Sequence, residues 1–474
     1  MIFLPAALAF LYVHSFGVNV VAGDSWSVAR LFGELYSGTL GLGDLWAQHG
    51  DHRMLFPRIA MLALGVITSF NSVAEMYLTL TCFLLTLIGL LLVFRNDVVK
   101  TSSWLFLFVP VAFMVFTFRQ YENMLSGFQV AFGFVQAFSV LALCSLYFTK
   151  YERYRKFAFL AALASATVGS FSAAQGLFAW PVGLFQLLIG PIERPTKRVM
   201  VVVWALVGVA EWIAYFIGFG RSEQSASLGH LLGNPTGAIE YFLTLLGGSL
   251  VWPLLEDSLL WQQTLALLGG LALVCLALAG LFLVFKDRKL GEYWFWVALL
   301  LFSFVVLASI TLGRSNYGIL QALASKYASF SVLAVIATYA ILVKLVLERR
   351  SYLTAGALGI LSVLILTSIP WYYSKGIEQG KSIKAQRERI AFILATYESQ
   401  PDEAFQEVHR KPNPNRVKRI KRQASFLDRL GYNVFSGERR DAASADLEGA
   451  VVRALLESKQ SSRSKIGGRV SVGL

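Results

Sequence analysis

The sequence predicts an all-α polytopic membrane protein with about eleven transmembrane helices, interfacial helices in the first outer loop and a small soluble C-terminal tail. Two features of its composition predict this class. Hydrophobic residues make up 56% of the 474 residues, whereas charged residues make up only 15%, and the mean hydropathy is +0.59. Soluble domains carry about a quarter charged residues. A third feature is the recurrence of apolar runs of about twenty residues, which is the length that crosses a bilayer as a helix.

The predicted spans cover most of the first 370 residues. Helices are expected, because a segment in lipid must satisfy its backbone polar groups internally. The apolar runs fall near residues 2–22, 75–94, 103–119, 129–148, 157–174, 176–191, 199–219, 262–285, 292–312, 327–347 and 352–370.

The basic residues of the short connections predict the orientation. With the N-terminus on the cytoplasmic side, every cytoplasmic connection is basic, as the bias of Lys and Arg toward that side requires. These connections are Arg95–Lys100, Lys150–Lys156, Ile192–Arg198, Lys286–Lys289 and Glu348–Arg350. We therefore expect a multi-pass protein of the plasma (inner) membrane, with its C-terminal tail on the extracytoplasmic side.

Two regions are expected: a transmembrane domain over residues 1–370 and a basic tail over residues 371–474. The tail carries 20 Lys and Arg against 12 Asp and Glu. It is predicted to form helices at Lys381–Glu398 and Arg416–Leu430 and to be disordered after about residue 437. A basic tail suits anionic lipid head groups or an anionic glycan, or is simply solvated. No motif accompanies the charge that would indicate nucleic acid.

The predicted outer segments hold most of the polar residues that can carry chemistry. Asp24 follows the first span directly, and the polar stretch from Asp44 to Arg53 comes next. The run Leu55–Phe70 is short and contains Arg58, which predicts a helix lying in the membrane interface.

These features resemble the GT-C superfamily of membrane glycosyltransferases, which use polyprenyl-phosphate sugars. The resemblance covers roughly residues 1–370 by topology. It rests on Asp24, on the basic and His-containing cluster before the second span, on Arg119–Tyr121 and on Lys326–Tyr327. Relatives commonly carry Arg-Tyr at the last position, so Lys326 departs from the pattern but keeps the charge. They can also carry an Asp-Glu pair after the first helix, whereas here Ser25 follows Asp24.

The resemblance implies an enzyme of the cell envelope, and the chemistry of sugar transfer can be stated without it. A carboxylate must accept the acceptor's proton, and cations must stabilise the leaving phosphate. Asp24 is the predicted general base, and Arg58, Arg119 and Lys326 are the predicted phosphate contacts. The further predicted substrate-binding residues are His52, Asp44, Trp46 and Glu211.

Each assignment has a structural alternative. Asp24 and Asp44 are also suited to capping a helix, and the three cationic side chains to anchoring in the interface. Trp46 can anchor there instead of stacking on a sugar. Glu211 lies within a predicted span, where a carboxylate is costly unless it is paired or functional.

The histidine-rich part of the first outer segment leaves a divalent metal open. His49, Asp51 and His52 are close in sequence, but this spacing is a weak signal for a metal and fits ordinary polar loop residues better. No metal ligand is therefore assigned.

The predicted function is transfer of a sugar from a polyprenyl-phosphate donor to a glycan, lipid or protein acceptor at the extracytoplasmic face. The alternative is a multi-pass transporter or a lipid or polysaccharide flippase, for which broken helices and internal repeats would be typical. A non-catalytic membrane scaffold is a third alternative. No phosphate-binding loop, dinucleotide fingerprint, HExxH or GxSxG motif occurs in the sequence.

Overall fold

The computed structural model describes residues 1–98, 104–220, 228–251, 259–349, 351–408 and 414–436. The predicted disorder after residue 437 lies outside these residues. The chain forms two compact units. The first unit comprises Met1–Gly17, Leu40–Leu64 and Val73–Lys384, and the second comprises Val18–Thr39, Gly65–Ser72 and Ala385–Leu474.

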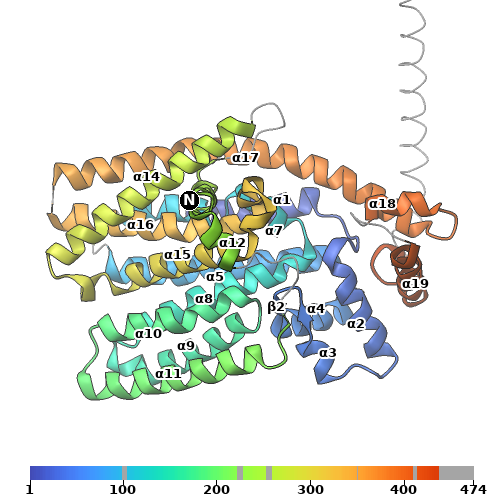
Figure 1. The fold of residues 1–474 in the computed structure, drawn as a ribbon, viewed down its shortest axis with the longest axis horizontal. Coiled ribbons are helices and arrows are strands. Elements are labelled where there is room, and N and C mark those ends of the chain that lie inside the picture. The colour runs from blue at the N-terminus through green and yellow to red at the C-terminus, as the bar shows by residue number, and fades with distance from the viewer. Residues whose placement is uncertain (99–103, 221–227, 252–258, 350, 409–413, 437–474) are drawn as a thin grey trace, which may run out of the picture. The chain divides into compact units, whose positions relative to one another are not determined.

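The described residues are almost entirely helical, as the composition predicts (Figure 1). The α-helices are α1 (Leu4–Phe16), α2 (Trp26–Tyr36), α3 (Leu42–Trp46), α4 (Leu55–Thr68), α5 (Ser72–Asp97), α6 (Trp104–Val115), α7 (Tyr121–Met124), α8 (Val130–Phe148), α9 (Arg155–Ser170), α10 (Ala179–Ile189), α11 (Arg194–Phe216), α12 (Leu228–Gly233), α13 (Pro235–Gly247), α14 (Leu259–Lys286), α15 (Trp294–Arg314), α16 (Ala328–Arg349), α17 (Tyr352–Ala395), α18 (Phe405–Val408) and α19 (Pro414–Leu430). The described strands are β1 (Gln48–His49) and β2 (His52–Arg53), which form one antiparallel pair.

Among the described residues, eight helical segments are long and apolar enough to cross a membrane. They are built on α5, α6, α8, α11, α14, α15, α16 and α17. The prediction of a multi-pass, all-α membrane protein is therefore confirmed, while the count of eleven spans stays a prediction. Three of the predicted spans correspond to the shorter helices α1, α9 and α10.

The first predicted span, 2–22, is longer than the helix found there. Helix α1 has 13 residues and ends at Phe16, so it is only about 20 Å long at 1.5 Å per residue. The backbone becomes extended at Gly17. The apolar run continues through Val18, Val20 and Val21, but β-branched side chains are less favourable in helices, and these residues belong to the second unit.

Helix α16 forms the centre of the first unit. Every residue from Ala328 to Leu345 is buried, and the helix packs against α6, α14 and α15. A helix that is apolar on all sides must be enclosed by other helices or by lipid. In α16 the enclosing surface is protein.

The segment between the predicted spans 199–219 and 262–285 contains a helix that was not predicted, and the C-terminal half of this helix is buried. Helix α13 packs closely along α14, because glycine lets the two backbones approach. A Cβ at Gly247 would lie 1.9 Å from the Ala266 carbonyl oxygen, and one at Gly270 would lie 1.9 Å from the Leu243 carbonyl oxygen. Small residues at helix contacts are typical of membrane interiors.

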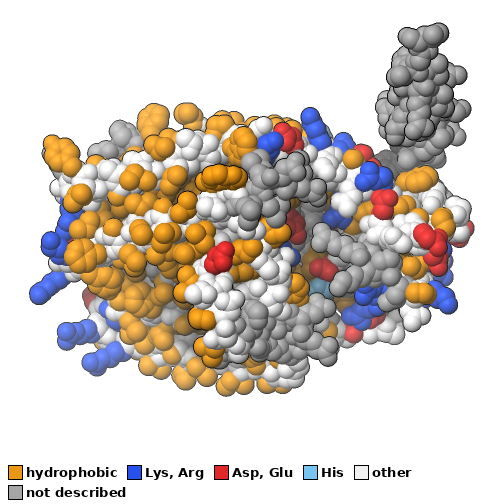
Figure 2. Space-filling model, turned by 45° about the horizontal axis from the view of Figure 1, so that its top comes forward, with side chains coloured by type: hydrophobic (Ala, Val, Ile, Leu, Met, Phe, Trp, Pro, Cys, Tyr) orange, Lys and Arg blue, Asp and Glu red, His pale blue; other side chains and the backbone are white. Residues whose placement is uncertain are grey.

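Hydrophobic side chains cover the exposed surface of the first unit's helices, and Lys and Arg side chains project at one end (Figure 2). On α11 and α14 the exposed residues include Val202, Leu206, Val209, Ile213, Leu271, Leu278 and Phe282. An apolar surface this extensive is unusual for a soluble protein and fits contact with lipid.

The five basic connections meet at this end of the first unit. Asp97, Lys150, Pro191, Lys289 and Glu348, which lie in these connections or directly beside them, line a single pocket. We call this the basic end. The predicted topology requires these five connections to lie on the same side of the membrane, and their meeting at one end agrees with it.

The second unit is held together by a buried asparagine. Asn433 is fully buried and has a φ of 58°, which Asn adopts more readily than most residues. Its side-chain amide donates to Asn19 Oδ1 at 2.9 Å and to the Phe70 carbonyl at 2.7 Å, and its Oδ1 accepts from the Val21 N–H at 2.9 Å. One side chain from the tail thus joins two segments from the first 72 residues.

The tail contains the two helical segments expected from its sequence. The predicted helix at Lys381–Glu398 is the continuation of α17, and α19 corresponds to the predicted Arg416–Leu430. Within the second unit α19 packs against α2.

The orientation can be tested by cysteine labelling. A cysteine introduced at Ser425 in α19 should react with a membrane-impermeant maleimide in intact cells. The matched control is Arg153→Cys, in the second basic connection, which should react only after permeabilisation. The reverse pattern would contradict the orientation and the side assigned to every site residue.

Candidate functional site

A small hairpin forms the edge of a polar cluster at the end of the first unit opposite the basic end. Gly50, at the turn between β1 and β2, has a φ of 55°, a conformation that favours glycine. Arg53 on β2 is buried and donates to the Tyr215 carbonyl at 2.6 Å and the Trp46 carbonyl at 3.0 Å. The hairpin is therefore fixed to the end of α11.

Charged side chains from distant parts of the sequence converge on this hairpin. Asp51 pairs with Arg314, at the end of α15, with 3.5 Å between carboxylate and guanidinium. The charges of Arg314, His49 and Lys326 all act on His52. We call Asp51, His52, Arg314 and Lys326 the polar cluster. The predicted residues His52 and Lys326 thus lie near enough for the charge of the lysine to act on the imidazole, as does the charge of Arg314.

His52 is neutral at physiological pH. Its pKa is lowered to about 4, mainly by burial and next by the positive charge of Arg314, while Asp51 opposes the shift. Its Nδ1 accepts a hydrogen bond from the Ala174 N–H at 3.3 Å. The remaining ring nitrogen therefore carries the proton and can donate to a substrate oxygen.

Lys326 is held by the backbone around it. It lies in a 3₁₀ turn, Ser325–Tyr327, and its carbonyl accepts from the Asn123 amide at 3.0 Å. Its ammonium lies 5.6 Å from the centre of the Tyr327 ring and is partly exposed. Within the described part of the chain, this ammonium makes no ion pair or hydrogen bond. A cation in this state is available to an anionic ligand.

Arg119, another predicted phosphate contact, is turned into the protein. It is 1% exposed. Its guanidinium donates to the carbonyls of Gly248 at 2.9 Å, Val251 at 3.1 Å and Leu323 at 2.6 Å. These contacts join the end of α6 to two segments more than a hundred residues away, which is a structural role.

Arg58 is held in the same way. It is 5% exposed, and one guanidinium nitrogen donates to the carbonyls of Asp44 at 3.2 Å and Leu45 at 2.9 Å, and also to Ala47. The carbonyls at the end of a short helix lack partners within the helix. Arg58 supplies partners for those of α3.

Asp44 and Trp46 also make contacts within the protein. The Asp44 carboxylate accepts from the Gly41 N–H at 3.0 Å in the first turn of α3. The Trp46 ring packs against Phe171 with 4.9 Å between ring centres, and Arg53 lies 5.0 Å from its centre. The Asp44 contact matches its capping alternative, whereas the contacts of Trp46 are with side chains of the protein.

Glu211 lies within α11 and is 8% exposed. Its carboxylate accepts hydrogen bonds from the Thr167 hydroxyl and from the Trp180 indole N–H, the latter at 3.0 Å. It therefore links α9, α10 and α11, and a carboxylate with these partners is expected at such a depth.

Asp24, the predicted general base, belongs to the second unit. It lies in a 3₁₀ turn, Gly23–Ser25, directly before α2, and its side chain is exposed. The N-cap position of α2 is occupied by Ser25. Asp24 therefore does not occupy the capping position that was its structural alternative.

No three side chains of His, Cys, Asp or Glu gather as metal ligands among the described residues. His49 instead packs against the Phe128 ring, with 5.0 Å between ring centres.

One buried carboxyl group was not identified from the sequence. Glu75, in the first turn of α5, is 1% exposed. Neither of its carboxyl oxygens has a hydrogen-bond partner among the described residues, and the group packs against Gly127. A Glu at the very start of an apolar run was the signal that could have identified it.

The fold and these contacts define a class, a multi-pass helical membrane protein with a polar cluster at one end. Comparison with known proteins does not assign the chain to a family within this class. No protein family matches this chain, and no curated protein is significantly similar to it.

The contacts of Arg119 predict that its substitution lowers the stability of the folded protein. In Arg119→Lys a single ammonium replaces the donors to three buried carbonyls, and each unsatisfied group costs about 1–3 kcal/mol. The melting temperature of the purified protein should fall clearly. Arg153→Lys, on an exposed side chain, should leave it unchanged. Unchanged melting of Arg119→Lys would contradict the structural role.

Proposed function

We propose that this protein is a membrane glycosyltransferase that takes a sugar from a polyprenyl-phosphate donor at the outer membrane face. The observation that supports it is the polar cluster, where two cations and a neutral histidine converge from three separate segments. The donor's phosphate gains charge as the glycosidic bond breaks, and cations placed beforehand stabilise that charge.

Lys326 is the proposed contact for the leaving phosphate. Its ammonium has no partner among the described residues, whereas the guanidinium groups of Arg58 and Arg119 are occupied by backbone carbonyls. Arg314 supplies a second positive charge, partly offset by Asp51. His52 is the proposed hydrogen-bond donor to a sugar hydroxyl. The ring is neutral, and because Nδ1 accepts from Ala174, the other ring nitrogen carries the N–H.

Asp24 remains the proposed general base, because it follows the first predicted span directly and its side chain is exposed. The proposed acceptor is a glycan, lipid or protein hydroxyl. Transfer moves the hydroxyl proton to the carboxylate, joins the hydroxyl oxygen to the sugar's anomeric carbon and releases polyprenyl phosphate.

A transporter is the second candidate, and Glu75 is the observation that favours it. Buried carboxyl groups within spans often carry protons or bind cations in transport. Gln136 on α8 is also fully buried, with both amide atoms unpartnered among the described residues.

Product analysis distinguishes the two candidates. Purified protein given a polyprenyl-phosphate sugar and an acceptor should release polyprenyl phosphate in step with glycosylated product. Movement of the intact donor across a vesicle membrane, with no release of polyprenyl phosphate, would favour the transporter.

Asp24→Asn should lower turnover while leaving folding nearly intact. The Asp24 side chain is exposed, so Asn of the same size should be tolerated there; Asn cannot accept the proton, and a general base contributes ~10²–10⁴-fold in rate. Turnover per folded molecule should fall at least a hundredfold, whereas Asp428→Asn in α19 should leave it unchanged. Near-normal turnover in Asp24→Asn would rule out the proposed base.

Lys326→Arg should retain activity, and Lys326→Gln should lose it. A charge-assisted hydrogen bond contributes ~1.5–3 kcal/mol, so turnover of the Gln variant should fall about ten- to a hundredfold. The matched control is Lys381→Gln, which removes the same charge from an exposed position of α17. Equal turnover in the Arg and Gln variants would return Lys326 to an anchoring role.

A further inference from the structure

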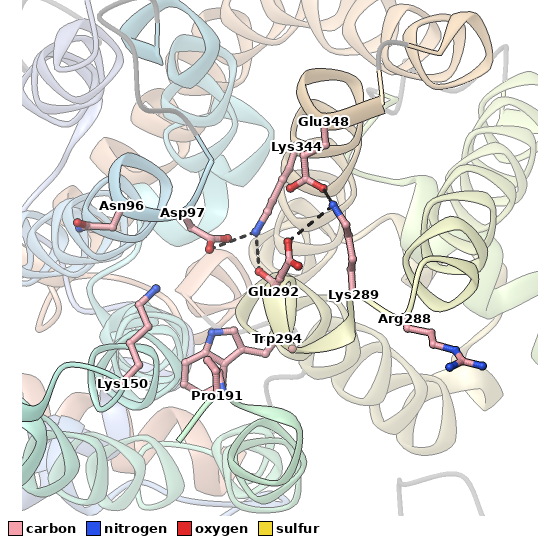
Figure 3. A pocket seen from close by; sticks show the side chains of 11 residues that line it. Asn96, Asp97, Lys150, Pro191, Arg288, Lys289, Glu292, Trp294, Lys344 and Glu348 are labelled. Carbon is pink, nitrogen blue, oxygen red and sulfur yellow. Dashed lines mark hydrogen bonds and ion pairs between the residues drawn. The ribbon is translucent and has the colours of Figure 1, made fainter. Parts of the chain in front are cut away.

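A pocket with charged walls lies at the basic end, away from the polar cluster. Its volume is about 570 Å³, within the range of small-molecule sites. Four cations and three carboxylates line it (Figure 3): Lys150, Arg288, Lys289, Lys344, Asp97, Glu292 and Glu348.

The carboxylates of this pocket are already engaged. Asp97 accepts from Lys344 at 3.3 Å and from the Trp296 indole N–H at 2.9 Å. Glu348 pairs with Lys289 at 2.8 Å, and Glu292 lies 3.9 Å from the same ammonium. Two of the four cations are thereby used, and all three carboxylates with them.

Lys150 is the cation left over inside the pocket. Its ammonium lies 3.7 Å from the centre of the Tyr147 ring and 5.1 Å from that of Tyr151, and it makes no ion pair within the described ranges. Figure 3 shows it directed toward the Lys344–Asp97 pair, while Arg288 points away. The aromatic rings hold the cation in place but do not neutralise it.

We propose that this pocket binds a phosphate monoester, with the Lys150 ammonium as its main contact. A phosphate presents three acceptor oxygens, which suits a cation without a carboxylate partner. The room beyond Lys150 is larger than a phosphate needs, and it is bounded by Trp294 and Pro191. The ligand therefore carries a small organic group, either in a soluble molecule or as a lipid head group. Basic pockets between membrane helices are known to hold anionic head groups.

The state of Lys150 gives the site a pH dependence. The pKa of Lys150 is lowered to about 8, mainly by burial; the charge of Asp97 opposes the shift, and the charge of Lys344 adds to it. The groups that face the ammonium are Asp97 on α5, Lys344 on α16, and the Tyr147 and Tyr151 rings. The ammonium is charged below about pH 8 and loses its proton above it, so phosphate binding weakens from pH 7 to pH 9.

The experiment uses the full chain, with two probes. Glycerol 3-phosphate, titrated into phosphatidylcholine nanodiscs, tests a soluble ligand. Phosphatidic acid, measured as lipid retained on the detergent-purified protein, tests a head group. Binding of either probe supports the site and identifies its source, and binding of neither overturns it.

The variants assign the binding to Lys150. Lys150→Gln should weaken binding about ten- to a hundredfold, as loss of a charge-assisted hydrogen bond predicts, and Lys150→Arg should retain most of it. The matched control is Lys156→Gln, in the same connection but exposed and outside the pocket. Equal binding by the two Gln variants would overturn the assignment. The assignment would also be overturned if the affinity of the unsubstituted protein stayed constant from pH 7 to pH 9. This measurement does not depend on a variant that folds.

Discussion

The first unit is organised around one buried ion pair. Lys344 and Asp97 lie 3.3 Å apart, and each side chain is only 8% exposed. The Lys344 ammonium also donates to the Glu292 carbonyl at 2.6 Å and lies 4.4 Å from the centre of the Tyr293 ring. A buried charge without partners costs several kcal/mol, so α5, α16 and the start of α15 must keep these groups together. The basic end, where the five connections meet, has its position fixed by this pair.

The sequence predicts the spans well, because crossing a lipid layer leaves few alternatives. An apolar run of sufficient length must be helical, and α5, α8, α14, α15 and α16 all correspond to predicted spans. Helix α13 was not predicted, because it has only 13 residues and the segment around it is polar at both ends. Its burial depends on Gly247 and Gly270 approaching neighbouring backbones, which is visible only once the helices are paired. The second unit was also hidden, because Asn433 acts on residues some four hundred positions earlier.

The candidate site was only partly predictable, because sequence position does not show what a side chain contacts. Arg58, Arg119 and Lys326 all lie in segments predicted to be outside, and nothing in the sequence separates them. In the structure, the two arginines donate to backbone carbonyls. The lysine ammonium has no such partner among the described residues. The difference follows from chemistry: a guanidinium has five donors in a fixed plane and can serve several carbonyls at once, whereas an ammonium is a compact charge.

At both ends of the first unit, within the part of the chain that the structure describes, some cations make structural contacts while one lysine does not. At each end one lysine, Lys326 or Lys150, lies beside tyrosine rings and lacks a carboxylate partner among the described residues. Other cations around it are committed to structural contacts, Arg119 at one end and Lys344 at the other. An aromatic face stabilises a cation by about 0.5–2 kcal/mol, less than a buried carboxylate would, and it adds no opposing charge that a phosphate must displace. A lysine placed against a ring is therefore kept in position while its charge stays available. The proposed anionic ligand of each lysine depends on this availability of its charge.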